Sequence, residues 1–418
     1  MDPRSLFDMR NHGGEEGDLP FAVVSGNFPE NGVALPIGNR KVRASALREF
    51  YVYKGKTPSH KVKIKFLQFF NFAFIWNLIF PNKFFAAVGP QKENFLSFLS
   101  GRMSNVNSEW SHIAFSIYVG SRKFLLPLFE GNTGALLGYA KIYLPGVERE
   151  YGENESATLK ALEKIDLGGV SVPKVLFEGD YRGFFILVLS PAAQAENFEG
   201  IAPAHAGFLK ELSEKTGEDT PFESSSFAEA ILREVAFLKE KMPAQAELVE
   251  YFHARAKEGL RGKLLRFSLV KREFPYFEML KSQMSHANGQ WSHMVLDWEQ
   301  ARSGFPPAFD LFSLLMSGAR YKRGGYAEAY RKNLMDIFFT ANEKTSRFAD
   351  PLFAFWKLTR ESSYWLFWLF LIDQLYIHVH VGHDSSAERV VKFLAEARGK
   401  EAAMLERWLA AGGASRRK

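Results

Sequence analysis

The sequence predicts an α+β fold of two lobes, in which a small antiparallel sheet is followed by a larger helical region. Two patterns predict it. Residues 84–190 contain short apolar segments separated by glycine turns, which is typical of antiparallel strands. From about 191 to 412, apolar residues recur at helical spacing, which predicts a series of amphipathic helices. A hairpin at 269–299 interrupts these helices.

Composition excludes several classes of protein. The chain of 418 residues is long enough for two or three lobes with a large core. It contains no cysteine, so disulfides and thiolate metal sites are excluded, which fits a reducing cytoplasm. The net charge of +6 favours anionic partners such as nucleotides or phospholipid, but the excess is modest and we expect no nucleic-acid partner. The polar, acidic start predicts no signal peptide.

Residues 1–83 are expected to form an N-terminal extension with strand-like pieces and one basic, aromatic helix. That helix, 66–80, follows three lysines within 61–65. It is shorter than the ~20 apolar residues that a spanning helix needs, as is the apolar stretch 364–377, which Asp373 interrupts. We therefore expect two buried helices. As an alternative, a basic aromatic helix can lie in a membrane interface, so segment 61–80 also suits peripheral membrane contact.

Three strands are expected to open the first lobe. Residues 112–119 alternate, 120–123 form a turn, and 124–129 continue as a strand. After a second turn, the strand 135–144 places Lys141 on one face between two tyrosines. A lysine in this setting can be an exposed residue whose stem lies over apolar surface, or it can be the partner of a buried acid.

The helix after this strand offers such an acid. Glu155, Leu159 and Leu162 lie at i, i+4 and i+7, which puts a carboxylate on the apolar face. A carboxylate that faces inward needs a cation, and Lys141 lies 14 residues upstream. Glu150 and Glu153 are alternative partners for that lysine. Alternatively, Glu155 only sits in the first helical turn, where the helix dipole favours an acid.

The rest of the chain continues in the same order of strands and then helices. Residues 172–177 and 183–189 predict an antiparallel pair that ends at Ser190-Pro191. Helices follow, three of them at 203–215, 227–241 and about 244–259, and further ones run from about 308 to 411. His378, His380 and His383 could bind a metal if their segment were a strand, but we do not expect a site there.

The hairpin 269–299 is expected to bring three carboxylates to one end. Asn288-Gly289 suits a type I′ turn, because both central residues need positive φ. Folding back would bring Glu273 and Glu278 of one arm near Asp297 of the other. Three close carboxylates need a cation, and oxygen ligands suit Mg²⁺ or Mn²⁺. The alternative is three solvated acids on a surface hairpin.

The motif LVKREFPYFEML followed by VLDWEQA resembles the catalytic segment of the aminoglycoside phosphotransferase and choline kinase-like family, LVHGDFxPWNIL and then DWE. The resemblance spans roughly 84–320 and implies a two-lobed protein kinase-like fold. It places the family's His-Gly-Asp on Lys271, Arg272 and Glu273. It also implies catalytic roles for Glu273 and Asp297, and metal binding by Asp297 and Glu278. Glu273 stands where the family has Asp, and Glu278 where it has Asn.

The same resemblance implies an ATP site. Lys141 would hold the α- and β-phosphates while Glu155 positions it. The first hairpin turn would lie over the phosphates, and the end of the strand pair would meet adenine. Asp310 is expected to cap its helix and to brace the active-site loops. The implied nucleotide-binding residues are Lys141, Glu155, Gly120, Ser121, Val188 and Ser190.

Two classes of function remain open from the sequence. One is an ATP-dependent phosphotransferase that acts on a hydroxyl of a small-molecule acceptor, such as a sugar or a glycan precursor. The other is a catalytically inactive, nucleotide-binding or scaffold protein of the same fold, favoured by the cations Lys271 and Arg272 beside Glu273. The direction of the Arg272 side chain separates them. The expected divisions are 1–83, the first lobe 84–190, the helical lobe 191–412 and a basic tail 413–418.

Overall fold

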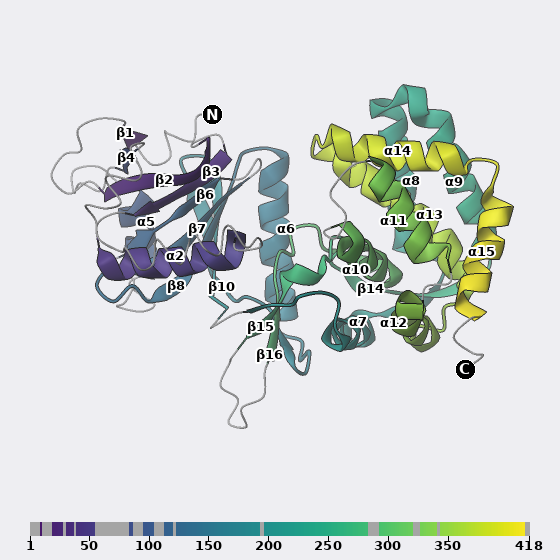
Figure 1. The fold of residues 1–418 in the computed structure, drawn as a ribbon, viewed down its shortest axis with the longest axis horizontal. Helices are drawn as coiled ribbons and strands as arrows, with labels where there is room; N and C mark the ends of the chain where they lie inside the picture. The colour runs from purple at the N-terminus through teal and green to yellow at the C-terminus, as the bar shows by residue number, and fades with distance from the viewer. Residues whose placement is uncertain are drawn as a thin grey trace. The chain divides into compact units, whose positions relative to one another are not determined.

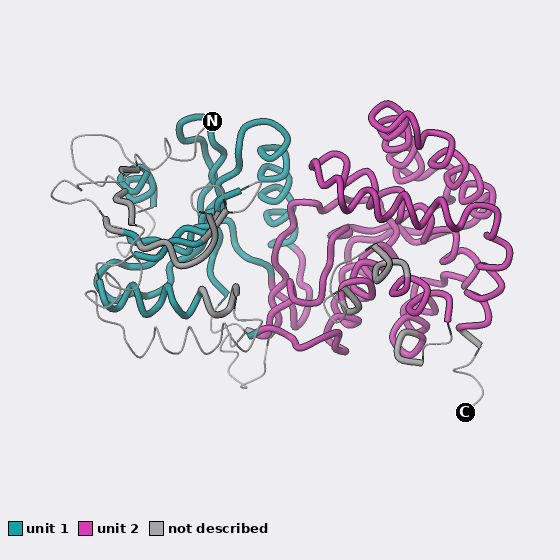
Figure 2. Tube along the Cα trace, turned by 45° about the horizontal axis from the view of Figure 1, so that its top comes forward, with its two compact units in different colours: residues 1–164, 172–196, 282–290 teal, residues 165–171, 197–281, 291–418 magenta. Residues whose placement is uncertain are grey.

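The computed structural model describes residues 9–10, 19–27, 31–36, 39–54, 83–86, 95–103, 113–119, 123–192, 196–282, 292–320, 327–340 and 343–413. The chain divides into two compact units, shown in different colours in Figure 2. Unit 1 comprises 1–164, 172–196 and 282–290, and unit 2 comprises 165–171, 197–281 and 291–418.

Unit 1 is built on one antiparallel sheet. Its strand order is β1-β4-β2-β3-β6-β7-β8-β11-β10, and β5 pairs with β7. The pairing of β3 with β6 joins the described strands of the predicted extension to the following strands in the same sheet. The strands are β1 (Met9–Arg10), β2 (Leu19–Asn27), β3 (Asn31–Pro36), β4 (Lys83–Ala86), β5 (Ile113–Phe115), β6 (Ile117–Val119), β7 (Lys123–Glu130), β8 (Leu136–Tyr143), β10 (Val175–Tyr181) and β11 (Phe184–Leu189).

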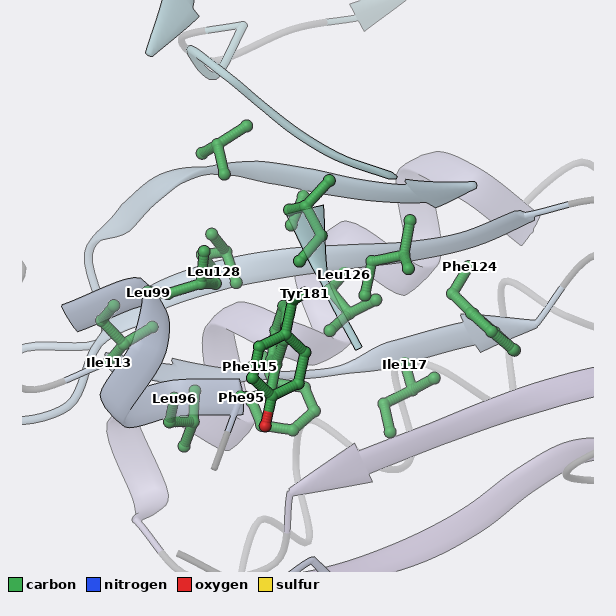
Figure 3. Packing of buried hydrophobic residues seen from close by; sticks show 14 of the residues in the cluster. Phe95, Leu96, Leu99, Ile113, Phe115, Ile117, Phe124, Leu126, Leu128 and Tyr181 are labelled. Carbon is green, nitrogen blue, oxygen red and sulfur yellow. The ribbon is translucent and has the colours of Figure 1, made fainter. Parts of the chain in front are cut away.

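Three described helices accompany this sheet: α2 (Arg40–Lys54), α5 (Phe95–Met103) and α6 (Val147–Leu162) (Figure 1). The main core of the unit is rich in aromatic side chains, and α5 packs its buried face onto it (Figure 3). There Phe95 lies edge-on to Phe115 and to Tyr181, with ring centroids 6.3 Å and 5.8 Å apart. The predicted helix 66–80 lies outside the described residues.

In its described residues, unit 2 is mostly helical, with two small groups of strands. In one, β14 lies between β13 and β17; in the other, β16 lies between β15 and β9, and β12 stands at the boundary of the units. The strands are β9 (Val170–Ser171), β12 (Glu196–Asn197), β13 (Glu218–Pro221), β14 (Leu264–Val270), β15 (Met279–Ser282), β16 (Ser292–Val295) and β17 (Arg302–Phe305). The helices are α7 (Pro203–Thr216), α8 (Ser226–Lys241), α9 (Ala246–Gly259), α10 (Ala308–Arg320), α11 (Ala327–Phe338), α12 (Glu343–Phe355), α13 (Arg360–His380), α14 (Asp384–Ala397) and α15 (Glu401–Gly413), with short 3₁₀ turns at Phe222–Ser224, Pro243–Gln245 and Tyr276–Glu278.

Helix α13 is the centre of unit 2. It contacts α8, α9, α10, α14 and α15, and nearly every residue from Ser362 to Ile377 is buried (Figure 1). The prediction of a buried helix over 364–377 is therefore confirmed. None of the described helices has the length and apolar character to cross a membrane.

The predicted α+β class is confirmed, with an antiparallel sheet in unit 1 and a helical majority in unit 2. One local prediction was wrong. Asp310 is the third residue of α10 rather than its cap, because the helix begins at Ala308. His378 and His380 belong to the end of α13, so they do not share the face that a strand would have given them.

Candidate functional site

In unit 1, Lys141 of β8 and Glu155 of α6 form a buried ion pair. The Lys141 ammonium donates to both carboxylate oxygens, at 2.7 Å and 2.9 Å. The Tyr143 hydroxyl donates to the same carboxylate at 2.5 Å. The predicted pair is confirmed over its alternatives, since Glu153 instead accepts a hydrogen bond from Arg149. Because both side chains are almost fully buried, the ammonium is held at one fixed position.

A glycine allows α6 to lie close enough for this pair. Gly152 is buried one helical turn before Glu155. A Cβ built at Gly152 would lie 2.5 Å from the ring of Tyr143 and 2.7 Å from that of Phe185. The absent side chain therefore lets the helix approach β8 and β11 closely.

The other predicted nucleotide contacts are less informative. Gly120 and Ser121 lie outside the described residues. Val188 belongs to β11, which pairs with β8 on one side and with β10 on the other. The Ser190 N–H donates to Lys174 O at 2.9 Å, and the Ser190 hydroxyl accepts from the Lys174 N–H at the same distance. The Ser190 N–H, part of the predicted adenine contact, is therefore already hydrogen-bonded to Lys174 within unit 1.

In unit 2, the segment after β14 is fastened by Asp310. The backbone N–H groups of Lys271 and Arg272 each donate to one Asp310 carboxylate oxygen, at 2.8 Å. Burial raises the pKa of Asp310 to about 6, while these hydrogen bonds act in the opposite direction. Arg272 adopts a φ of 66°, which L residues rarely adopt. The predicted bracing role of Asp310 in this loop thus corresponds to two direct hydrogen bonds.

The Arg272 side chain points into the helical core. Its Nε donates to Asp373 of α13 at 2.8 Å, and its Nη2 donates to Glu234 of α8 at 2.7 Å and also to Asp373. The guanidinium lies over the rings of Phe305 and Tyr376. Sequence reasoning missed Glu234 and Asp373 as its partners. The available signal was Asp373 itself, because an acid inside an apolar helix needs a cation.

Lys271 lies with the carboxylates of the predicted hairpin. Its ammonium donates to the Glu278 carboxylate and, at 2.8 Å, to the backbone oxygen of Glu273. The Leu296 N–H donates to Glu278 O at 2.9 Å, which brings the arm ending in Asp297 beside Glu278. Burial chiefly raises the pKa of Glu278 to about 8; Asp297 and Glu273 add to this and Lys271 opposes it. Glu278 is thus within electrostatic reach of both other acids and of the Lys271 ammonium.

The hairpin that carries these acids is present, with β15 and β16 as neighbouring strands. Its turn, Asn288-Gly289, lies outside the described residues. Asp297 follows β16 with a φ of 57°. A non-glycine residue in this conformation costs of order 1–3 kcal/mol and is more frequent at functional sites. Asp297 and Arg272 are therefore two strained positions on the segments that carry the predicted catalytic residues.

The side chains do not fit a site in which Glu278 and Asp297 hold a divalent ion together. One oxygen of the Glu278 carboxylate already accepts from the Lys271 ammonium, and this positive charge would repel a second cation on the same carboxylate. Among the described residues, no three His, Cys, Asp or Glu side chains come together in a way that could hold a metal ion. This includes His378, His380 and His383.

The chain is structurally similar to aminoglycoside phosphotransferases. The hygromycin B and ADP complex of APH(4)-Ia is 11% identical, with 73% of this chain and 98% of that chain covered and a TM-score of 0.46. The gentamicin complex of APH(2″)-IIa is 16% identical, with 72% and 97% covered and a TM-score of 0.45. ADP-bound APH(2″)-Ib is 16% identical, with 76% and 99% covered and a TM-score of 0.42. No protein-family model and no curated protein sequence matches the chain.

Proposed function

We propose that this protein binds ATP and transfers a phosphoryl group to a hydroxyl of a small-molecule acceptor, such as a sugar or a glycan precursor. The buried Lys141–Glu155 pair is the observation that carries the proposal. An ammonium fixed by two carboxylate bonds and a neighbouring tyrosine is a positioned charge for phosphate oxygens. Positioning of this kind is most of what phosphoryl transfer requires of a protein.

Glu273 is the proposed acceptor of the proton from the attacking hydroxyl. It follows two residues whose backbone is held by Asp310, and Arg272 beside it is anchored in the core of unit 2. These bonds fix the backbone from which the Glu273 side chain extends. Its side chain is one methylene longer than that of Asp, and a displacement of ~1 Å can cost on the order of 10²-fold in rate. We therefore expect slow turnover.

The sequence also implies Mg²⁺ or Mn²⁺ at Asp297 and Glu278. A divalent ion would supply charge neutralisation to the phosphates. At Glu278 it would share the carboxylate with the Lys271 ammonium, and the two cations would repel each other. We therefore assign no step of the reaction to such an ion.

The second candidate is a nucleotide-binding protein without catalysis, and the position of Lys271 favours it. Its ammonium engages Glu278 and the backbone of Glu273. Those contacts occupy one carboxylate oxygen of Glu278 and place a positive charge beside the backbone of the proposed base. The direction of the Arg272 side chain, by contrast, does not favour this candidate, because Glu234 and Asp373 hold it within the helical core of unit 2.

Two measurements test the proposal. Thermal unfolding with and without ATP should show a stabilisation that Lys141→Met removes and that Lys164→Met keeps. Lys164 is an exposed lysine at the end of the same helical region, so it controls for the lost charge. ATP turnover with a panel of hydroxyl acceptors should disappear in Glu273→Gln. Stabilisation without turnover would select the second candidate, and a wild type that ATP does not stabilise would exclude both.

A further inference from the structure

The carboxylates of the loop and hairpin in unit 2 carry their own cation. We propose that the Lys271 ammonium is the resident counter-ion of Glu278, and that it excludes a divalent ion from that carboxylate. The inference concerns the apo protein and does not depend on nucleotide binding. The family motif has a histidine at the position of Lys271, so the resemblance does not imply this role.

The first support is the set of bonds that the ammonium makes. An ammonium has three N–H donors and no acceptor. One donor of Lys271 goes to the Glu278 carboxylate and another to the Glu273 carbonyl oxygen at 2.8 Å. A divalent cation at Glu278 would bind the same carboxylate, and two cations on one carboxylate repel each other.

The second support is the fixed position of Lys271. Its side chain is 1% exposed. Its own N–H is bound by Asp310 at 2.8 Å, and the next residue is tied to α8 and α13 through its guanidinium. The backbone around Lys271 is therefore fixed. Its buried side chain lacks the rotational freedom by which an exposed lysine would move away from Glu278.

The third support is the need for a cation at this place. Glu278 feels the negative charges of both Asp297 and Glu273. Without Lys271, the Glu278 carboxylate would face these two negative charges while partly shielded from water. One or two carboxylates, completed by water, are enough to hold Mg²⁺ or Mn²⁺. Removing the ammonium should therefore turn the carboxylates into a divalent-ion site.

Manganese titration of the full-length protein without nucleotide tests this, with free Mn²⁺ followed by electron paramagnetic resonance. Wild type should show no Mn²⁺ site at Glu278. Lys271→Met, which keeps most of the side-chain volume, should gain one site that binds Mn²⁺ at least tenfold more tightly than any site of wild type. Adding Glu278→Gln should remove that gain. Lys257→Met, an exposed lysine of α9, makes the same charge change and should gain nothing.

A second comparison needs no substitution at Lys271. Wild type and Glu278→Gln should give the same Mn²⁺ isotherm, because Glu278 holds an ammonium rather than a metal. Tighter binding to wild type than to Glu278→Gln would overturn the proposal, as would a folded Lys271→Met protein that gains no site. Since ATP is absent from these titrations, failure of the proposed ATP-dependent function would leave them unchanged.

Discussion

Replacing Arg272 by Met should strongly destabilise unit 2. The substitution keeps the length of the aliphatic stem and keeps a Cβ at a residue with positive φ, so the backbone strain is nearly unchanged. It removes only the guanidinium, which donates hydrogen bonds to Asp373 and Glu234. The Arg272 side chain is 2% exposed. The experiment therefore isolates the buried charge.

The expected loss is about 4 kcal/mol in the free energy of unfolding. Hydrogen bonds to charged groups contribute ~1.5–3 kcal/mol each, but bonds within one network do not add. Removing one partner of a buried ion pair typically costs ~3–5 kcal/mol, because the remaining charge stays buried without compensation. Here Asp373 is fully buried and one oxygen of Glu234 is buried without a hydrogen-bond partner. A loss of this size is a large part of a typical stability of ~5–15 kcal/mol.

Urea unfolding at pH 9, where Glu234 is ionised, followed by tryptophan fluorescence measures this loss, because Trp298 and Trp368 lie buried in unit 2. Arg233→Met is the control, since its guanidinium is 72% exposed in a surface pair and should cost under about 0.5 kcal/mol. Adding Glu234→Gln and Asp373→Asn to Arg272→Met should restore part of the stability, because no carboxylate is then left without a cation. A cost for Arg272→Met below about 1 kcal/mol would refute the reasoning.

Three further predictions follow from burial and close packing. Gly152→Ala should cost about 1–3 kcal/mol by overpacking against Tyr143 and should weaken the ATP-dependent thermal shift, because α6 carries Glu155; an unchanged shift would contradict the geometry of the pair. Gly259→Ala should destabilise unit 2 in urea by a similar amount, because a Cβ there meets the Trp365 indole, whereas Gly207→Ala in α7 meets nothing within 4 Å and should stabilise by ~0.5–1 kcal/mol. Burial raises the pKa of Glu234 from 4.5 to about 8, so the folded state binds more protons than the unfolded state between these values. That contribution to stability should be complete below pH 4.5 and disappear as the pH rises through 8, and Glu234→Gln should flatten this part of the pH profile.

Several features were predictable because they depend on neighbours in the sequence. The strands and helices follow from apolar periodicity, and α6 was predictable together with the direction of Glu155. Once that acid was known to face inward, Lys141 on the adjacent strand was a natural partner. The gathering of Glu278 with Asp297 also followed from a local event, the reversal of the chain in a hairpin.

The partners of Arg272 and Lys271 were not predictable in the same way. Glu234 and Asp373 lie 38 and 101 residues from Arg272, and nothing along the chain marks them as its neighbours. The prediction that Asp310 caps its helix was wrong for the same reason. Its carboxylate oxygens accept hydrogen bonds from backbone N–H groups 38 and 39 residues away. An acid near the start of a helix can cap that helix or accept hydrogen bonds from a distant loop. Only the packing of α10 against the loop decides which of the two it does.

The sequence by itself determined the class of the fold, the order of the elements and the residues that could carry charge in the site. Only the tertiary structure decided how the remaining charges pair: Arg272 with acids of the helical core, and Lys271 with Glu278. Secondary structure depends on residues a few positions apart, whereas a buried charge is stabilised by whichever opposite charge folding brings within hydrogen-bond distance.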